Sequence, residues 1–370
     1  MICAEEEIWI CALSLCTRFE GGLARRLYDH YGSARAVFKQ PLSELVRHKG
    51  LRRSIAEKIS DKNLLSTADN VMKWLIAKNI HPVFLYDQTY PHRLRECPDA
   101  PLLLYVAGEA DLNSSHVLSV VGTRSATLYG KSLCRDIISG FVPLGIRPVI
   151  VSGLAFGIDI TAHRAAMENN LQTVAVLPTG IDTIYPASHR DTATDILQRG
   201  AVISEFPPST QNNRHNFLQR NRIIAGISDA TLVVESRTDG GAMITAHLAS
   251  GYSRDVLAVP GRPSDVCSKG CNDMIRTNKA ALVTSARDIA DVMGWETTGK
   301  DARALQLELF EALDEKEKEI LNYIKEDNGD IHTIRNRTII DFTELSTILE
   351  KLQEKGFVEC LEKDKYRSLI

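Results

Sequence analysis

The chain has 370 residues, of which 44% are hydrophobic and 25% are charged, and its formal net charge is −3. This is an ordinary globular composition with enough apolar material for a packed core, and the length suggests two or three domains. No run of about 18 uncharged apolar residues occurs, so the sequence predicts no membrane-spanning segment.

The N-terminus and the cysteines both indicate a cytoplasmic protein. Three glutamates at 5–7 precede the first apolar run, whereas a secretory signal carries positive charge there and a small-residue cleavage site. The eight cysteines include no CxxC pair, and the nearest approach to one, Cys267 and Cys271, does not fill a tetrahedral zinc site. We expect reduced thiols, no metal and no cofactor.

Charge is unevenly distributed along the chain. Residues 301–370 contain 11 basic and 17 acidic residues and so carry −6, which leaves +3 for residues 1–300. Because phosphate binding requires local cations, a nucleic-acid site is expected before residue 300.

Residues 1–75 are predicted to be helical, from apolar positions spaced about 3.6 residues apart in 23–38 and 52–59. Within this region, HKGLRRSIAEKI (48–59) resembles a helix-hairpin-helix element, which offers backbone N–H groups to a phosphate. The alternative is a small helical (SAM-like) domain with a glycine turn.

Residues 76–294 have a different pattern, which predicts a Rossmann-like α/β domain. The segments HPVFLYD (81–87) and APLLLYVAG (100–108) are rich in β-forming residues. Short runs of valine and isoleucine then alternate with helical stretches, which is typical of a doubly wound, mostly parallel sheet. The predicted strands of this alternating part lie within 116–122, 147–153, 172–178, 201–206, 230–236 and 255–261.

After Gly294 the composition changes again. Residues 295–310 are predicted to be a linker, and 311–370 to form two helices and a β-hairpin, as in a winged helix. Winged helices often bind DNA, but the surplus of six negative charges favours a protein contact; the other possibility is a generic helical cap.

Ligands of a doubly wound sheet bind at the carboxyl ends of its strands, so the loops there carry the candidate site. After the first parallel strand, Gly122 permits a tight turn, Thr123 offers a hydroxyl and Arg124 can bind phosphate oxygens through two N–H groups. A Gly-x-Gly-x-x-Gly dinucleotide fingerprint is absent.

The next loop, SGLAFGIDITAH (152–163), opens a helix with the small residues Ser152, Gly153 and Gly157. A helix N-terminus of this kind binds anions. Phe156 in the same loop either stacks on a base or packs in the core.

Asp159 and His163 share one face of the helix that follows. An acid–base pair is one interpretation, but a carboxylate that orients the histidine or caps the loop is the simpler one. No catalytic triad, Walker A motif or metal-ligand spacing occurs. We therefore expect a binding protein and not an enzyme.

Further along the chain, LPTGIDTIYPASHR (177–190) places His189 and Arg190 after a loop shaped by Asp182. The sequence FLQRNRIIAGIS puts two arginines and an asparagine (220–222) at the predicted start of a helix, suited to phosphate and base-edge contacts. Gly240 and Gly241 form another glycine-rich loop that opens a helix. The preceding Glu235 disfavours a phosphate above it and is expected to bind a backbone N–H or to orient an arginine.

With these loops in order, residues 80–290 resemble the DNA-processing protein A (DprA/Smf) family. The resemblance is carried by eight ordered segments: VVGTR, SGLAFGIDITAH, LPTGIDTIYP, SEFPP, RNRIIAGIS, VVES with GGAMITA, VLAVPG and GCNDMIR. It implies sequence-tolerant binding of single-stranded DNA, a homodimer, loading of the recombinase RecA and a role in natural transformation. It also implies that Arg124 contacts DNA and that Ser152, Gly153, Phe156, Gly157 and the RNR segment line the pocket.

The sequence departs from the family at several positions. A lysine common after Tyr-Pro is replaced by Ala187, and FPxRNR reads FLQRNR. The predicted DNA-binding residues are Gly122, Thr123, Arg124, Ser152, Gly153, Phe156, Gly157, His189, Arg190, Arg220, Asn221, Arg222, Gly240 and Gly241. The residues predicted to support the pocket are Asp159, His163, Asp182 and Glu235.

Three other functions are compatible with such a fold. Nucleotide phosphoribohydrolases of similar fold use a Pro-Gly-Gly-x-Gly-Thr loop followed by glutamate, whereas this chain has TDGGAMITAH without that acid. A sensor of free nucleotides would bind a mononucleotide at low concentration. A regulator of double-stranded DNA would act through the winged helix, against which the acidic C-terminal region argues.

Overall fold

The computed structural model describes residues 4–17, 22–61, 63–297, 313–326, 331–338, 340–355, 357–362 and 365–368. The chain divides into two units, Met1–Gly299 and Lys300–Ile370, which are described separately. Of the predicted linker 295–310, only 295–297 fall within the described residues. No helix in the described ranges is long and apolar enough to cross a membrane.

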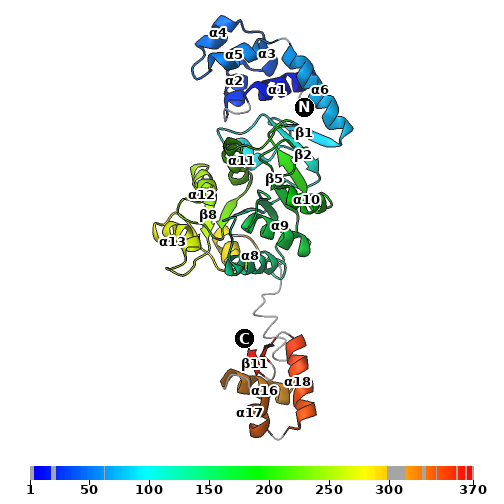
Figure 1. Cartoon of the computed structure of the whole chain (residues 1–370), viewed down its shortest axis with the longest axis vertical. Coiled ribbons are helices and arrows are strands. Elements are labelled where there is room, and N and C mark those ends of the chain that lie inside the picture. The colour runs from blue at the N-terminus through cyan, green and yellow to red at the C-terminus, as the bar shows by residue number, and fades with distance from the viewer. Residues whose placement is uncertain are drawn as a thin grey trace. The chain divides into compact units, whose positions relative to one another are not determined.

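The first unit begins with a cluster of helices, drawn in blue in Figure 1. Their apolar faces belong to the same buried cluster as residues of the sheet, such as Leu27 with Leu104 and Val176. The helical part therefore packs directly on the α/β part. The helices are α1 (Ala4–Thr17), α2 (Leu23–Tyr31), α3 (Ala34–Phe38), α4 (Leu42–Arg47), α5 (Arg53–Ile59) and α6 (Asn63–Ala77).

A nine-stranded sheet follows, in the order β1-β2-β6-β5-β4-β3-β7-β8-β9. Strands β1, β2 and β6 pair antiparallel, and all pairs from β6 to β9 are parallel. This confirms the predicted mostly parallel, Rossmann-like sheet. The strands are β1 (Ile80–Phe84), β2 (Leu103–Gly108), β3 (Val117–Val121), β4 (Val149–Ser152), β5 (Thr173–Val176), β6 (Ala201–Ser204), β7 (Ala230–Val233), β8 (Asp255–Ala258) and β9 (Ala281–Leu282).

Helices cover both faces of this sheet, which is why its central strands consist of buried residues without alternation. On one face Val121 packs in a cluster with Ile223 of α11, and on the other Val120 packs in a cluster with Ile137 of α8. The helices of this part are α7 (His92–Glu96), α8 (Leu128–Gly140), α9 (Ile158–Glu168), α10 (Arg190–Ile196), α11 (Arg214–Ile227), α12 (Gly241–Gly251), α13 (Lys269–Arg276) and α14 (Ala286–Met293).

The strand order reverses at β3. From β3 the chain continues to β4, β5 and β6 on one side and then returns to β7, β8 and β9 on the other. At such a reversal the loops after neighbouring strands run to opposite sides and leave a crevice at the carboxyl ends. The crevice here lies beyond the ends of β3 and β7.

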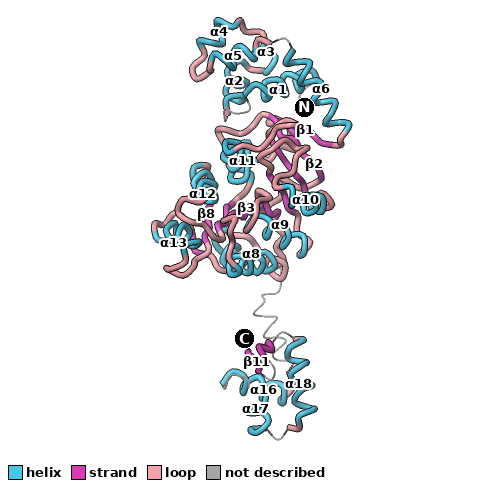
Figure 2. Tube along the Cα trace, in the orientation of Figure 1, coloured by secondary structure: helices cyan, strands magenta, loops and turns pink. Residues whose placement is uncertain are grey.

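The second unit contains α16 (Glu315–Glu326), α17 (Ile331–Arg337), α18 (Phe342–Glu354), β10 (Val358–Glu362) and β11 (Lys365–Ser368). Figure 2 shows its helices in cyan and its strands in magenta. Strands β10 and β11 pair antiparallel, which confirms the predicted hairpin. The helix α17 was not predicted; Ile331 and Ile334 attach it to a core that includes Leu349 and Phe357.

Candidate nucleic-acid interface

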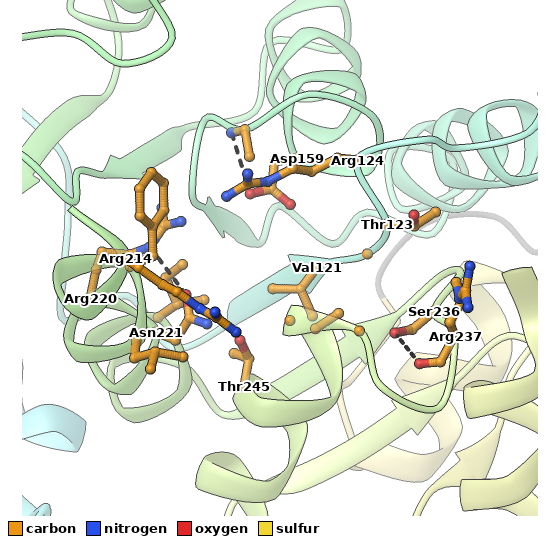
Figure 3. Close-up of a pocket in the computed structure, with 18 of the residues that line it drawn as sticks. Val121, Thr123, Arg124, Asp159, Arg214, Arg220, Asn221, Ser236, Arg237 and Thr245 are labelled. Atoms are coloured by element: carbon orange, nitrogen blue, oxygen red, sulfur yellow. Dashed lines mark hydrogen bonds between the residues drawn. The ribbon is translucent and has the colours of Figure 1, made fainter. Parts of the chain in front are cut away.

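A cavity of about 560 Å³ opens at the reversal of strand order. Its walls come from the loops after β3, β4 and β7 and from α11 and α12 (Figure 3). In Figure 3, Arg124 and Asp159 lie on one side, Arg220 on α11 on a second, and Arg237 on a third. The volume is in the range of small-ligand sites in proteins.

Arg124 lies on the exposed rim of this cavity, in the loop that follows β3. Its guanidinium carbon is 5.0 Å from the centre of the Phe217 ring on α11. The preceding residue is fixed, because the Thr123 N–H donates to the Glu235 carbonyl oxygen at 2.7 Å. The cation is thus exposed while its backbone is held.

Glycines let the loops after β3 and β4 touch each other. Gly157 has a φ of +79°, and a Cβ atom there would lie 2.1 Å from the Thr123 carbonyl oxygen. A Cβ atom on Gly122 would lie 2.4 Å from Ile158 Cγ1. Only glycine satisfies both the backbone conformation and the close approach at Gly157.

Arg220 is buried beneath the cavity and is fixed by the ends of two strands. Its Nη1 group donates to the carbonyl oxygens of Gly153 and Val176, both at 2.6 Å, and its Nε donates to Asn221 Oδ1 at 3.2 Å. Burial lowers the pKa of Arg220 to about 10, opposed by the charge of Asp159. The arginine therefore stays cationic at neutral pH and supplies a fixed positive charge.

Asp159 forms a hydrogen bond within its own loop. Its carboxylate accepts from the Ala155 N–H at 3.4 Å, and burial raises its pKa against the opposing effect of Arg220. His163 is completely buried, its Nδ1 lies 2.7 Å from Thr173 Oγ1, and burial lowers its pKa to about 3. The two side chains bond to different partners, so the acid–base interpretation finds no support.

The remaining predicted support residues hold loops to one another. Glu235 accepts from the N–H and the Oγ1 hydroxyl of Thr127, at 2.9 and 2.5 Å. Asp182 accepts from the Ser209 N–H at 2.9 Å, joining the loops after β5 and β6. Ser152, which the sequence placed among the DNA-binding residues, is instead buried and donates to the Val120 carbonyl oxygen at 2.6 Å, so its hydroxyl is occupied inside the sheet.

Phe156, His189 and Arg190 do not line the cavity. The Phe156 side chain is 49% exposed, and its ring meets the His189 ring edge-on at 4.7 Å. His189 is buried, with Nδ1 2.8 Å from the Leu154 carbonyl oxygen, while Arg190 is exposed at the start of α10. Phe156 is therefore a supported, half-exposed ring and not a core residue.

The structure places Arg222 away from the cavity. Helix α11 begins at Arg214, so residues 220–222 lie in its interior, and the predicted helix start was wrong. Arg222 is buried, pairs with Glu205 and donates to the Asp99 carbonyl oxygen. Its charge is therefore paired inside the protein. Arg220 and Arg222 are two positions apart on the helix and point to different sides of it.

The family is decided by comparison with known proteins. Residues 81–294 match the family described as DNA recombination-mediator protein A. The chain belongs to this family. The resemblance inferred from the ordered segments is thereby confirmed.

Curated relatives of this family are similar over much of the chain. Protein Smf of Synechocystis is 35% identical over 278 residues, covering 74% of this chain and 69% of that protein. The DNA processing protein DprA of Streptococcus pneumoniae is 40% identical over 205 residues, covering 55% and 71%. The putative DprA of Mycobacterium tuberculosis is 37% identical, and the chain spans 65% of its length.

Two solved DprA structures share the fold. The S. pneumoniae structure covers 79% of this chain and 98% of its own, with a TM-score of 0.60 and 30% identity. The Helicobacter pylori structure, described as giving insight into a single-stranded DNA binding mode, covers 59% of this chain and 97% of its own, with a TM-score of 0.53 and 25% identity.

In this member of the DNA recombination-mediator protein A family, sequence reasoning missed several residues that line the cavity. Arg214, Phe217 and Arg237 complete its walls. One signal was present: Asn213 caps α11, since its side chain accepts from the Asn216 N–H, and asparagine is among the preferred N-cap residues. Recognising it would have placed Arg214 at the helix start and Phe217 on its first turn.

The cavity of this family member is strongly cationic. The described lining includes four arginines (124, 214, 220 and 237) and a single carboxylate, that of Asp159, which is buried. Gly240, at the start of α12, has no side chain that could cap the helix, so this helix N-terminus is not covered by a capping group. No cluster of three potential metal ligands occurs among the described residues.

Proposed function

We propose that this protein binds single-stranded DNA with little sequence preference and acts as a recombination mediator. The observation that carries the proposal is the arginine-lined cavity at the reversal of strand order, bordered by partly exposed aromatic rings.

The cations suit a phosphodiester backbone. Arg124, Arg214 and Arg237 are exposed side chains from three different segments that face one cavity. Arginines and backbone N–H groups bind phosphate oxygens without reading bases. Contacts of this kind make binding tolerant of sequence and sensitive to salt.

The aromatic rings suit unpaired bases. Phe217 lies against Arg124 and meets the half-exposed Tyr185 edge-on at 5.5 Å. Phe156 presents a second ring beyond the cavity. Stacking on such rings requires bases that are free of a duplex, and each is worth about 1–3 kcal/mol.

We also propose that the protein is not an enzyme. The titratable groups nearest the cavity serve structure: Asp159 holds its loop, and Arg220 holds the ends of β4 and β5. His163 bonds to Thr173 inside the protein. A general acid or base must instead reach the substrate.

The wider role follows from the resemblance and is part of the proposal. We infer a cytoplasmic homodimer that loads RecA onto single-stranded DNA during natural transformation. The helices α16–α18 with the hairpin β10–β11 fit a winged helix for protein contact, and α4 and α5 fit a helix-hairpin-helix. A dimer would hold two stretches of one strand, and linked sites gain affinity through effective concentration.

The test is fluorescence anisotropy with labelled oligothymidylate, competed by duplex of equal length and by mononucleotides. The proposal expects tight binding that neither competitor displaces, followed by faster RecA filament assembly on the bound strand. Binding or hydrolysis of mononucleotide without strand binding would establish the nucleotide-enzyme or sensor function instead.

A further inference from the structure

A second cavity, of about 640 Å³, lies at the same edge of the sheet. It is lined by Thr127 and Tyr129 from the start of α8 and by residues 260–262 and Asp265 from the loop after β8. None of these residues lines the first cavity.

The segment that follows β7 is hydrogen-bonded to the walls of both cavities. Glu235 binds Thr127 of the second cavity through its carboxylate and Thr123 of the first through its carbonyl oxygen. Helix α13, which follows the loop after β8, is tied to the same segment, because the Gly270 N–H donates to the Ser236 carbonyl oxygen at 2.8 Å. Thr127 lies four positions after Thr123, so their Cα atoms are at most about 14 Å apart.

Tyr129 presents an aromatic ring at this second cavity. It is 51% exposed, and its hydroxyl donates to the Pro260 carbonyl oxygen at 3.1 Å. Leu128, which precedes Tyr129 in the sequence, and Val266, which follows Asp265, are 87% and 60% exposed.

The charges around the second cavity suit a base inside it and a phosphate between it and the first cavity. Arg262 and Asp265 both line the cavity, so their charges oppose each other and a free anion gains little. Arg237, on the loop after β7, lines the first cavity, and its ion pair with Asp239 is exposed and therefore weak. Arg237 can turn to a phosphate between the two cavities.

We propose that single-stranded DNA held in the first cavity continues across the end of β7 and stacks a base on Tyr129. This inference rests on the proposed function and extends its site from one cavity to two. The ligand is a further nucleotide of the same strand, because the second cavity alone has no net positive charge to hold a separate phosphate.

The experiment compares two lengths of labelled oligothymidylate, roughly 4 and roughly 16 nucleotides, which bracket the usual site sizes of single-strand binders. Tyr129→Ala is expected to weaken binding of the longer strand about tenfold, the loss of one stacked base, and to leave the shorter strand within about twofold of wild type. Tyr129→Phe keeps the ring and is expected to bind as wild type. Phe342→Ala, which removes an exposed ring of the second unit, is the matched control.

A direct readout is photocrosslinking with 5-iodouracil at successive positions of the longer strand. The proposal expects a crosslinked peptide containing Tyr129 from one position, and from no position of the shorter strand. Equal weakening of both lengths, a Tyr129→Phe variant as weak as Tyr129→Ala, or unchanged binding of the longer strand overturns it. If the wild-type protein binds neither length, the proposed function itself fails, which is a different result.

Discussion

The guanidinium carbon of Arg124 lies 5.0 Å from the centre of the Phe217 ring, so a cation and an aromatic ring from distant parts of the chain form one surface at the rim of the cavity. The ring orients the guanidinium for a phosphate. The part of the ring that the guanidinium does not cover can still contact a base. This pairing leads to the first two predictions.

Reversal of the charge at Arg124 should abolish tight strand binding. Arg124→Glu is expected to weaken oligothymidylate binding at least tenfold at moderate salt, because a phosphate contact is replaced by repulsion. In Arg124→Gln, the slope of log affinity against log salt should become shallower by about 0.7. The control is Arg147→Glu, an exposed arginine just before β4 at the opposite edge of the sheet. Wild-type affinity in Arg124→Glu with an unchanged melting temperature would remove Arg124 from the site.

Loss of the Phe217 ring should weaken binding without loss of charge. Phe217→Ala is expected to cost about 1–3 kcal/mol of binding free energy, and the salt slope should stay that of wild type, because stacking releases no counterions. Titration at three salt concentrations separates the two effects. A changed salt slope in Phe217→Ala would mean that the ring acts by positioning Arg124.

Substitution of Gly157 should disrupt the contact between the loops after β3 and β4. In Gly157→Ala, the new Cβ atom would lie 2.1 Å from the Thr123 carbonyl oxygen at a φ of +79°. We expect a free energy of unfolding lower by more than about 1 kcal/mol, measured by urea denaturation, together with weaker strand binding. Gly241→Ala is the matched control, since a Cβ atom there meets nothing within 4 Å and φ is ordinary. Equal stability of the two variants would contradict the close approach.

Arg222 should matter for stability and not for DNA. Arg222→Met leaves Glu205 as an unpaired buried carboxylate and is expected to lower the free energy of unfolding by about 3–5 kcal/mol. The double variant Arg222→Met with Glu205→Leu should recover much of this loss, because it removes both charges. At a temperature where the variants are folded, strand affinity should equal that of wild type. A specific loss of affinity in the folded double variant would restore the DNA contact inferred from the sequence.

His163 should make stability depend on pH. Burial lowers its pKa from 6.5 to about 3, so between these values the unfolded chain binds a proton that the folded protein does not. Stability therefore rises with pH through this window, and this group alone should make the protein about 2 kcal/mol less stable at pH 5 than at pH 7. Urea denaturation at the two pH values measures the difference. His163→Gln should reduce it, whereas the exposed His247→Gln should leave it unchanged.

Much of the fold follows from local patterns in the sequence. The segment VLSVV gave a strand because five successive apolar or small residues suit burial on both faces, and β3 is indeed buried throughout. The strands β4 to β8 follow the same reasoning. Helix α17 was not predicted in this way. Two of its described side chains, Ile331 and Ile334, are buried, and they pack in the core of the second unit.

The site was predicted in part. Gly122, Thr123, Arg124, Gly240 and Gly241 come from loops at the ends of parallel strands, so topology alone brought them to one edge, and all five line the cavity. Arg220 and Arg222 look equivalent in sequence. The structure buries both, Arg220 beneath the cavity and Arg222 in an ion pair with Glu205. Their partners, the Gly153 carbonyl oxygen and Glu205, lie far away in the sequence or in another element, so the residues around the arginines do not predict them.

The sequence by itself determined the family, through the resemblance of its eight ordered segments. It also determined the parallel sheet and the edge at which the cavity opens, because these depend on periodicity and strand direction. Only the tertiary structure decided which cations face the cavity. That choice depends on the rotation of α11 against the sheet, which turns Arg220 toward β4 and β5 and Arg222 toward Glu205. Helix rotation is fixed by packing with residues far away in the chain, and such packing leaves no signal in the residues nearby.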